Sequence, residues 1–187
     1  MEYQQPQFYQ FNEDSIYLVE YVSGLGLRPK SILDIGCGCG VLAIEYIKKL
    51  NYQISHVGLI ELQEEFRPYI ENNFSIMLPH LNYNLSIRKL SINEDEQVFD
   101  LVLSNPPYFK EGAGRVSSSK NRQLCRTFQD NNILEWVEYS LSFLAKRGVM
   151  FFLCHKSNKD IKELLKKSYV SIVDEKKEVL VLKAFKE

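Results

Sequence analysis

A glycine-rich turn between a short apolar strand and a helix constrains the fold of this chain more than any other feature. Residues 31–35 are an apolar run of strand length, and residues 41–50 repeat apolar side chains at helical spacing. The turn between them reads Gly-Cys-Gly-Cys-Gly, and glycine lets the backbone approach a ligand closely. A strand, a glycine turn and a helix in this order predict an α/β domain that holds a nucleotide-type ligand at the turn.

Two acids beside this turn indicate which ligand it holds. Asp34 lies two residues before the first glycine, where it would repel a pyrophosphate but attract a cation. Glu61 ends a second predicted strand (residues 56–60) about twenty residues past the glycines, where an acid can bind ribose hydroxyls. Glu61 would equally suit the first turn of a helix, where the helix dipole favours acids. We predict a positively charged nucleoside cofactor, bound by Asp34, Gly36, Cys37, Gly38, Gly40 and Glu61.

An Asn-Pro-Pro-Tyr turn, residues 105–108, ends another predicted strand at residues 98–104. The prolines stop this strand and hold the turn stiffly at its carboxyl end, where open α/β sheets bind ligands. The side-chain oxygen of Asn105 and the carbonyl of Pro106 can accept both N–H bonds of a planar amino group, and Tyr108 offers a face for stacking. Two fixed acceptors favour the electron-rich amine of a transition state, so Asn105, Pro106 and Tyr108 are the predicted catalytic residues. An ordinary turn with a packed tyrosine is the alternative.

The remaining chain continues the alternation of helices and strands. A chain of 187 residues is expected to form one domain. Pro68 must kink the next helix or lie at its beginning, and Trp136 and Tyr139 are expected to serve packing. We predict strands at residues 84–89, 148–154, 169–173 and 178–185, a helix capped by Asp130 or Asn131, and another helix opened by Ser157 or Asn158.

Charge is distributed unevenly along a chain whose net charge is only −1. Residues 1–109 contain 7 basic and 14 acidic side chains, whereas residues 145–187 contain 11 basic and 6 acidic ones. The segment at residues 110–127 is rich in Gly and Ser and is mostly basic, and long loops of this kind are functional or disordered. Its charge and its place after the Asn-Pro-Pro-Tyr turn predict a loop that binds a phosphate-bearing substrate. The C-terminal lysines would either attract phosphates too or simply solvate the surface.

Composition excludes several other classes of protein. No apolar run approaches the ~20 residues of a membrane span, and no secretory leader is recognisable, so we expect a cytoplasmic protein without a membrane partner. The four cysteines and three histidines lack the paired spacing of metal ligands. We therefore expect neither a metal site nor a disulfide framework.

The glycine turn and the Asn-Pro-Pro-Tyr turn, about seventy residues apart, together resemble the two motifs of the S-adenosylmethionine (SAM)-dependent amino-methyltransferases. The resemblance covers about residues 30–187, as the methyltransferase domain, and leaves residues 1–29 as an N-terminal lead-in and helix. It implies a Rossmann-like class I methyltransferase fold: an α/β protein whose mostly parallel sheet is flanked by helices and closed by an antiparallel C-terminal hairpin. It also implies SAM as the cofactor, with Asn105 beside it.

Within this group, the chain is most similar to the bacterial tRNA (adenine-N6) methyltransferases. Residues 104–109, Gly112 and the Ser-Ser-Ser-x-x-Arg-x-x-x-Arg pattern ending at Arg126 carry this similarity. Such enzymes usually place an Asp after the third strand to contact adenine, and Ser91 stands at the matching position here. The similarity implies adenine N6 methylation, tRNA as the partner, and substrate contacts from Pro107, Phe109, Lys110, Lys120, Arg122 and Arg126.

Residues 13–15 leave other functions open. Their Glu-Asp-Ser sequence resembles the lead-in of enzymes that methylate protein glutamine, in which the hydroxyl residue, here Ser15, reaches the cofactor carboxylate. Only 29 residues precede Lys30, fewer than the helical recognition domain of the release-factor enzymes needs. The alternatives are protein glutamine N5-methylation, DNA or rRNA amino-methylation, and cofactor binding without catalysis. Intact Asn105 and Tyr108 count against the last.

Overall fold

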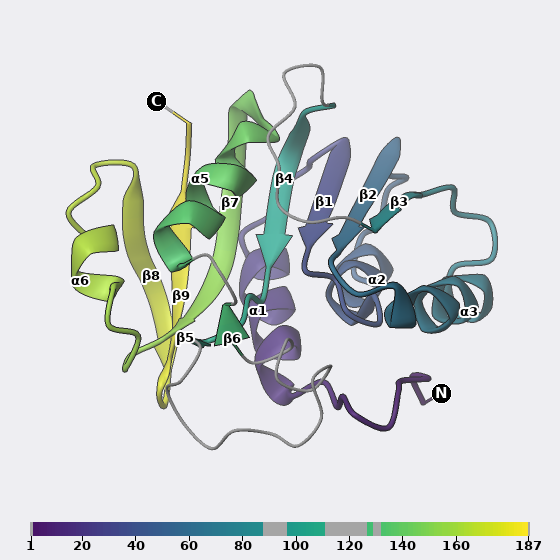
Figure 1. Cartoon of the computed structure of the whole chain (residues 1–187). Coiled ribbons are helices and arrows are strands. Elements are labelled where there is room, and N and C mark those ends of the chain that lie inside the picture. Colours follow the sequence, from purple (N-terminus) through teal and green to yellow (C-terminus); the bar gives the residue numbers. More distant parts are fainter. Residues whose placement is uncertain (1, 88–96, 111–126, 129–131, 187) are drawn as a thin grey trace.

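A computed structural model describes residues 2–87, 97–110, 127–128 and 132–186. Most of the described strands form one sheet of seven, in the order β3-β2-β1-β4-β7-β9-β8 (Figure 1). The strands are β1 (Ser31–Ile35), β2 (His56–Glu61), β3 (Asn84–Ile87), β4 (Phe99–Ser104), β7 (Leu144–His155), β8 (Val170–Lys176) and β9 (Val179–Ala184). The helices are α1 (Glu13–Gly24), α2 (Val41–Lys48), α3 (Arg67–Met77), α5 (Ile133–Ser142) and α6 (Ile161–Leu164), with a 3-10 turn, η1, at Glu64–Phe66.

The sheet is parallel from β3 to β7 and antiparallel at its C-terminal end. β1 pairs in parallel with β2 and with β4, and β4 pairs in parallel with β7. β9 runs antiparallel to both β7 and β8, so the last two strands form a hairpin at one edge. This arrangement confirms the predicted class I methyltransferase fold.

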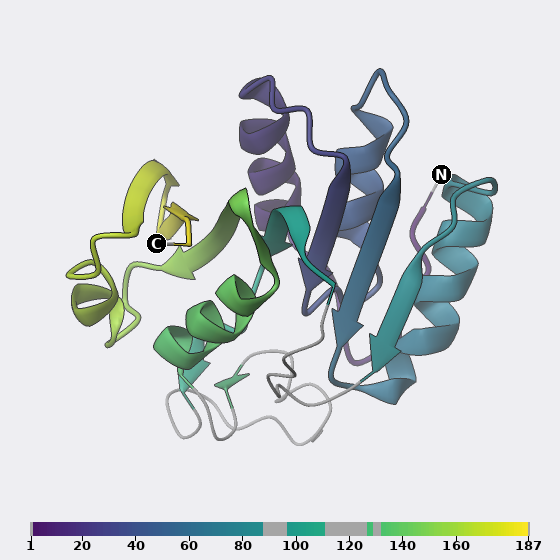
Figure 2. The same cartoon turned by 90° about the horizontal axis from the view of Figure 1, so that it is seen from above.

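Helices cover both faces of the sheet, which explains why its central strands are mostly apolar. Figure 2 shows α1, α2 and α3 on one face and α5 and α6 on the other. Successive residues of a strand point to opposite faces of the sheet. Ile32 packs in the hydrophobic cluster with α1, α2 and α3, whereas Leu33 packs in the cluster with α5 and α6. Among the described residues, no helix has the length and apolar character needed to cross the bilayer.

The beginnings of the helices differ in part from the prediction. Pro68 lies in the first turn of α3, as expected. The cap of α5 is Asn132, not Asp130 or Asn131, because its side chain accepts hydrogen bonds from two backbone N–H groups of the first turn. The helix predicted to open at Ser157 or Asn158 begins only after Asp160. The reason is that the Asn158 side chain accepts a hydrogen bond from the Asp160 N–H in the preceding turn.

β7 is longer than predicted and starts at Leu144 rather than at residue 148. Phe99 pairs with Leu144, and the register then shifts before Leu101 pairs with Val149. Gly148 lies at this irregularity, where a Cβ atom would come 2.8 Å from the Phe99 carbonyl oxygen. Glycine thus lets the strand continue through a bulge that a larger residue would block.

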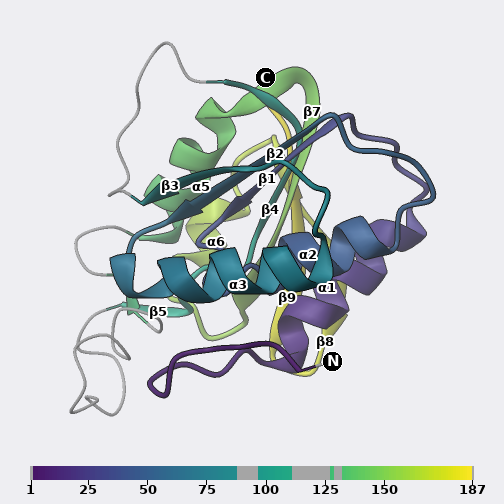
Figure 3. The ribbon, with the colours of Figure 1, turned by 90° about the vertical axis from the view of Figure 1, so that its right-hand side faces the viewer.

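The N-terminal lead-in, residues 2–12, lies along the edge of the sheet at which β1, β2 and β4 end (Figures 1 and 3). Asn73 of α3 holds it there: its side chain accepts a hydrogen bond from the Gln4 N–H and donates to the Gln4 carbonyl, both at 2.9 Å. The same amide also donates to the carbonyl of Cys39 in the glycine turn, at 3.0 Å. The lead-in is therefore tied to the turn that was predicted to hold the cofactor.

Candidate functional site

The carboxyl ends of three parallel strands bring the predicted site residues together. Ile35, the last residue of β1, is in register with Ile60 of β2 and with Ser104 of β4. The glycine turn, Glu61 and the Asn-Pro-Pro-Tyr turn consequently leave the sheet side by side. This is the edge at which open α/β sheets bind ligands.

Backbone hydrogen bonds fix the glycine turn on the end of β2. The N–H groups of Gly36 and Cys37 donate to the Ile60 carbonyl at 2.8 and 3.1 Å. Gly40 has a φ of +78° at the beginning of α2, and a Cβ atom there would lie 2.6 Å from the Phe74 ring. A larger residue at Gly40 would meet both a strained backbone and an occupied space.

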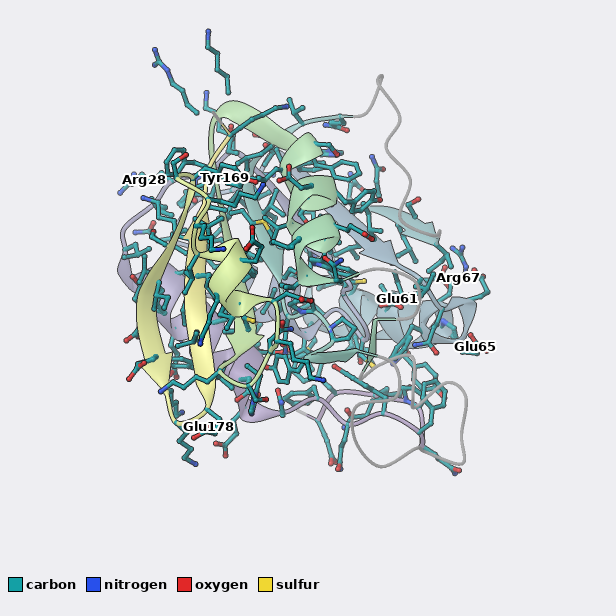
Figure 4. The ribbon with its side chains drawn as sticks, turned by 60° about the vertical axis from the view of Figure 1, so that its left-hand side comes forward. Arg28, Glu61, Glu65, Arg67, Tyr169 and Glu178 are labelled. Carbon is teal, nitrogen blue, oxygen red and sulfur yellow. The ribbon has the colours of Figure 1, made fainter. Side chains whose placement is uncertain are left out.

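Glu61 connects the end of β2 with the glycine turn. Its Oε2 accepts a hydrogen bond from the Gly38 N–H at 2.8 Å, and its Oε1 accepts from the N–H groups of Leu62 and Gln63 at 2.8 and 3.0 Å. Burial raises the pKa of Glu61, although these N–H donors oppose the shift. In Figure 4, Glu61 lies within the outline of the molecule, whereas Glu65 projects at its right-hand edge.

Asp34 is a second buried acid beneath the glycine turn, and only 2 % of it is exposed. Its Oδ2 accepts a hydrogen bond from the Ala43 N–H in the first turn of α2, at 3.1 Å. Burial raises the pKa of Asp34 to about 7; the Ala43 hydrogen bond opposes this shift, and the charge of Glu61 adds to it. A bound cation would favour the ionised form of this carboxyl group.

Asn105 contacts α1 as well as the end of β4. Its Nδ2 donates to the Ser15 hydroxyl at 3.0 Å, and Ser15 is 6 % exposed. Because the amide nitrogen faces Ser15, the amide oxygen lies on the other branch, where an amino group would have to meet it. The structure thus unites the predicted catalytic residue Asn105 with the predicted cofactor residue Ser15.

Tyr108 is held from two sides. Its hydroxyl donates to Asp14 Oδ2 of α1 at 2.9 Å, and its carbonyl accepts from the Asn158 side chain at 3.2 Å. Its ring lies 5.9 Å from that of His155, centroid to centroid. Burial raises the pKa of the Tyr108 hydroxyl, with a further contribution from the Asp14 carboxylate. The hydroxyl is therefore a donor at neutral pH.

Several of these contacts were absent from the sequence prediction. Asp14 belongs to the Glu-Asp-Ser sequence at residues 13–15, so the sequence offered a signal that could have identified it. Asn158, which lies in the loop after β7, was predicted only to open a helix and not to bond Tyr108. Nothing in the sequence indicated that Ser104 and Trp136 form a pair. Trp136 was expected to serve packing, but its indole N–H also donates to the Ser104 hydroxyl.

The predicted substrate residues are described only in part. Pro107 follows the buried Pro106 and is partly exposed. Phe109 and Lys110 form β5, which pairs in parallel with β6 at residues 127–128. Residues 109–110 and 127–128 therefore lie side by side. Ser91, Lys120, Arg122 and Arg126 lie outside the described residues. Within the described region, no group of three or more His, Cys, Asp or Glu side chains is placed to hold a metal ion.

Comparison with known proteins identifies a family. A family model described as "Methyltransferase small domain" matches residues 13–183. A tRNA1(Val) (adenine(37)-N6)-methyltransferase from Haemophilus influenzae is 30% identical over 71% of this chain and 56% of its own length. The enzyme of the same name from Actinobacillus pleuropneumoniae is 30% identical over 67% of this chain and 52% of its own length. The chain thus spans about half the length of the curated relatives it matches.

Solved structures share the fold at low sequence identity. A 16S rRNA N2 methyltransferase from T. thermophilus, in complex with AdoMet and guanosine, has a TM-score of 0.68 at 19% identity, covering 95% of this chain and 44% of its own. An S-adenosylmethionine-dependent methyltransferase from Clostridium acetobutylicum has a TM-score of 0.59 at 13% identity, covering 95% of this chain and 92% of its own.

Proposed function

The chain belongs to the methyltransferase small domain family, and from this membership we propose that it transfers a methyl group from SAM to an exocyclic amino group, adenine N6 of a tRNA. The meeting of two turns at one edge of the sheet supports this proposal most strongly. The glycine turn follows β1, the Asn-Pro-Pro-Tyr turn follows β4, and the two strands are direct neighbours. One turn suits a nucleoside cofactor and the other suits an amino group, so the donor and the acceptor of a methyl group would meet there.

The groups beside the glycine turn fit SAM chemically. Asp34 would stabilise its positive charge, and the Ser15 hydroxyl would contact its carboxylate. Glu61 Oε2 accepts one N–H in the structure and can accept a ribose hydroxyl as well. Leu62, which is 42 % exposed, offers an apolar contact for the adenine ring. When bound, SAM supplies an electrophilic methyl group on its sulfonium.

The Asn-Pro-Pro-Tyr turn would hold and activate the accepting amine. Asn105 Oδ1 and the Pro106 carbonyl would each accept one N–H bond of a flat amino group. The amine becomes positively charged as it gains a methyl group, so these fixed acceptors stabilise the transition state more than the ground state. Tyr108, held through its hydroxyl by Asp14, would stack its ring on the base.

The choice of tRNA rests on the relatives and on charge. The matched curated relatives are named as tRNA adenine N6 methyltransferases. The basic residues of the segment 110–126 would attract the phosphates of such a substrate and follow the catalytic turn directly. A tRNA substrate would in turn place the enzyme in the cytoplasm.

The proposal is tested by offering labelled methyl-SAM together with tRNA, DNA and protein from the organism that encodes the chain. We expect label in tRNA, entering roughly 100- to 1,000-fold more slowly with Asn105→Ala. Label in protein instead would favour glutamine methylation, the function that the Glu-Asp-Ser sequence at residues 13–15 also fits. If calorimetry showed that SAM binds but no label entered tRNA, DNA or protein, the function would be cofactor binding without methyl transfer.

A further inference from the structure

We propose that Trp136 and Ser104 are positioning residues that set the distance between the glycine turn and the Asn105 turn. This inference rests on the proposed function, since it concerns how the methyl donor and the amine are aligned. Neither residue is expected to touch the substrate or the cofactor.

A chain of buried hydrogen bonds joins the ends of β1 and β4. The Trp136 Nε1–H donates to the Ser104 hydroxyl at 3.0 Å, and that hydroxyl donates to the Ile35 carbonyl at 2.8 Å. Ser104 is fully buried and Trp136 is 8 % exposed. The Ser104 hydroxyl takes part in both hydrogen bonds, and a buried network of this kind resists small displacements.

The same indole also packs against the glycine turn. Gly36 has a φ of +73°, and a Cβ atom there would lie 3.2 Å from both Cη2 and Cζ2 of Trp136. Gly36 is the first residue after β1, and Ser104 is the last residue before Asn105. One side chain of α5 therefore contacts the cofactor turn through its ring and the strand that carries Asn105 through its N–H.

This double contact differs from ordinary core packing. A buried tryptophan needs a partner for its N–H, but that partner can lie anywhere in the core. Here both contacts fall on the two turns whose separation would determine the approach of the amine to the methyl group. A misplacement of about 1 Å between reacting groups can cost roughly 100-fold in rate.

The first arm of the test uses the fact that Trp136 is the single tryptophan of the chain. Titration with SAM or its demethylated product should change the tryptophan emission saturably, with the Kd that calorimetry gives. An emission spectrum unchanged at saturating cofactor would contradict the coupling of the indole to the cofactor turn. This arm needs no methyl acceptor, so it stands even if tRNA proves to be the wrong substrate.

The second arm compares Trp136→Phe, Ser104→Ala and the double variant, with labelled SAM and tRNA. Each single variant should lower kcat about 10-fold or more, while the KM for tRNA and the Kd for SAM change by less than about 3-fold. The double variant should be no slower than the worse single variant, because both changes break one connection. Ser142→Ala is the matched control, since it removes a hydroxyl that bonds the Tyr139 carbonyl in the same helix.

Two results would overturn the inference. One is an additive loss of kcat in the double variant. The other is a drop in Tm with an unchanged kcat per folded molecule, which would reduce Trp136 to a packing residue. A wild-type protein that binds SAM but transfers nothing to tRNA would instead contradict the proposed function, and the emission arm would still decide whether the indole reports on the cofactor turn.

Discussion

Asp34 is an acid whose protonation depends on the fold. Burial raises its pKa from 3.8 to about 7. Between these pH values the folded protein holds a proton that the unfolded chain has lost. The free energy of unfolding should therefore fall as the pH rises through this window, by up to about 1.4 kcal/mol per pH unit. Asp34→Asn should flatten that slope in denaturation series from about pH 4 to about pH 7.

Glu61, whose pKa burial also raises, should supply part of the slope that remains in Asp34→Asn. Identical slopes for the wild type and Asp34→Asn would mean that Asp34 titrates alike in the folded and unfolded chains.

Glu61 should matter more to the cofactor than a surface acid does. It joins the Gly38 N–H to the end of β2. Glu61→Ala should weaken SAM binding by about 1–3 kcal/mol, the range for leaving buried hydrogen-bonding groups unpaired. Calorimetry can measure this, with Glu20→Ala, a change in an exposed acid of α1, as the unaffected control. Wild-type SAM affinity in both Asp34→Ala and Glu61→Ala would refute this placement of the cofactor.

At the residue scale, the sequence was informative wherever a motif lies at the end of a strand. Asp34 is the second-last residue of β1, Glu61 ends β2 and Asn105 follows β4. Parallel pairing collects such positions at one edge. Trp136 and Asn158 reach the site from other elements, through hydrogen bonds to the Ser104 hydroxyl and to the Tyr108 carbonyl. No spacing in the sequence records such contacts, so they became visible only in the structure.

At the scale of elements, strands were easier to predict than the beginnings of helices. Residues 130–132 read Asp-Asn-Asn, and each of these residue types can cap a helix. Their local chemistry is therefore alike, and only the structure shows that Asn132 makes the capping hydrogen bonds. The same limit applies to α6, whose predicted opening residue Asn158 instead donates to the Tyr108 carbonyl.

The cap of α5 can be tested directly. Asn132 accepts hydrogen bonds from the Leu134 and Glu135 N–H groups at 2.8 and 3.1 Å. Asn132→Ala should lower the free energy of unfolding by about 1 kcal/mol, whereas Asn132→Asp, which keeps a capping oxygen, should retain most of it. Chemical denaturation measures both. Equal stability of the alanine variant and the wild type would show that Asn132 does not cap the helix.

At the scale of the whole molecule, the fold followed from alternating strands and helices, whereas the division of the chain at residue 30 stays a prediction. The parallel pairing of the central strands accompanies helices on both faces, as the alternation of strands and helices indicates, whereas the order of the strands came from the structure. The path of residues 2–12 across the glycine turn could not be predicted, because it depends on distant partners such as Asn73.

The uneven charge of the chain leads to a prediction about RNA binding. Lys120, Arg122 and Arg126 lie outside the described residues, but their charges follow from the sequence. If they bind phosphates, the triple alanine variant should bind tRNA more weakly, and its salt dependence should be flatter by nearly one unit of slope for each phosphate that is no longer neutralised. Filter binding across a salt series measures this, and SAM affinity should stay unchanged. An unaltered slope would assign the segment another role.

The central claim is that Asn105 accepts hydrogen bonds from the amine that receives the methyl group. The most direct measurement is the rate at which N6-methyladenosine forms in tRNA, followed by mass spectrometry of nucleosides, for the wild type, Asn105→Ala and the exposed control Asn51→Ala. We predict that Asn105→Ala lowers kcat by roughly 100- to 1,000-fold while SAM affinity stays unchanged, because a preorganised acceptor acts mainly in the transition state. Asn51→Ala should match the wild type. Methylation by Asn105→Ala at the wild-type rate would contradict this role of Asn105.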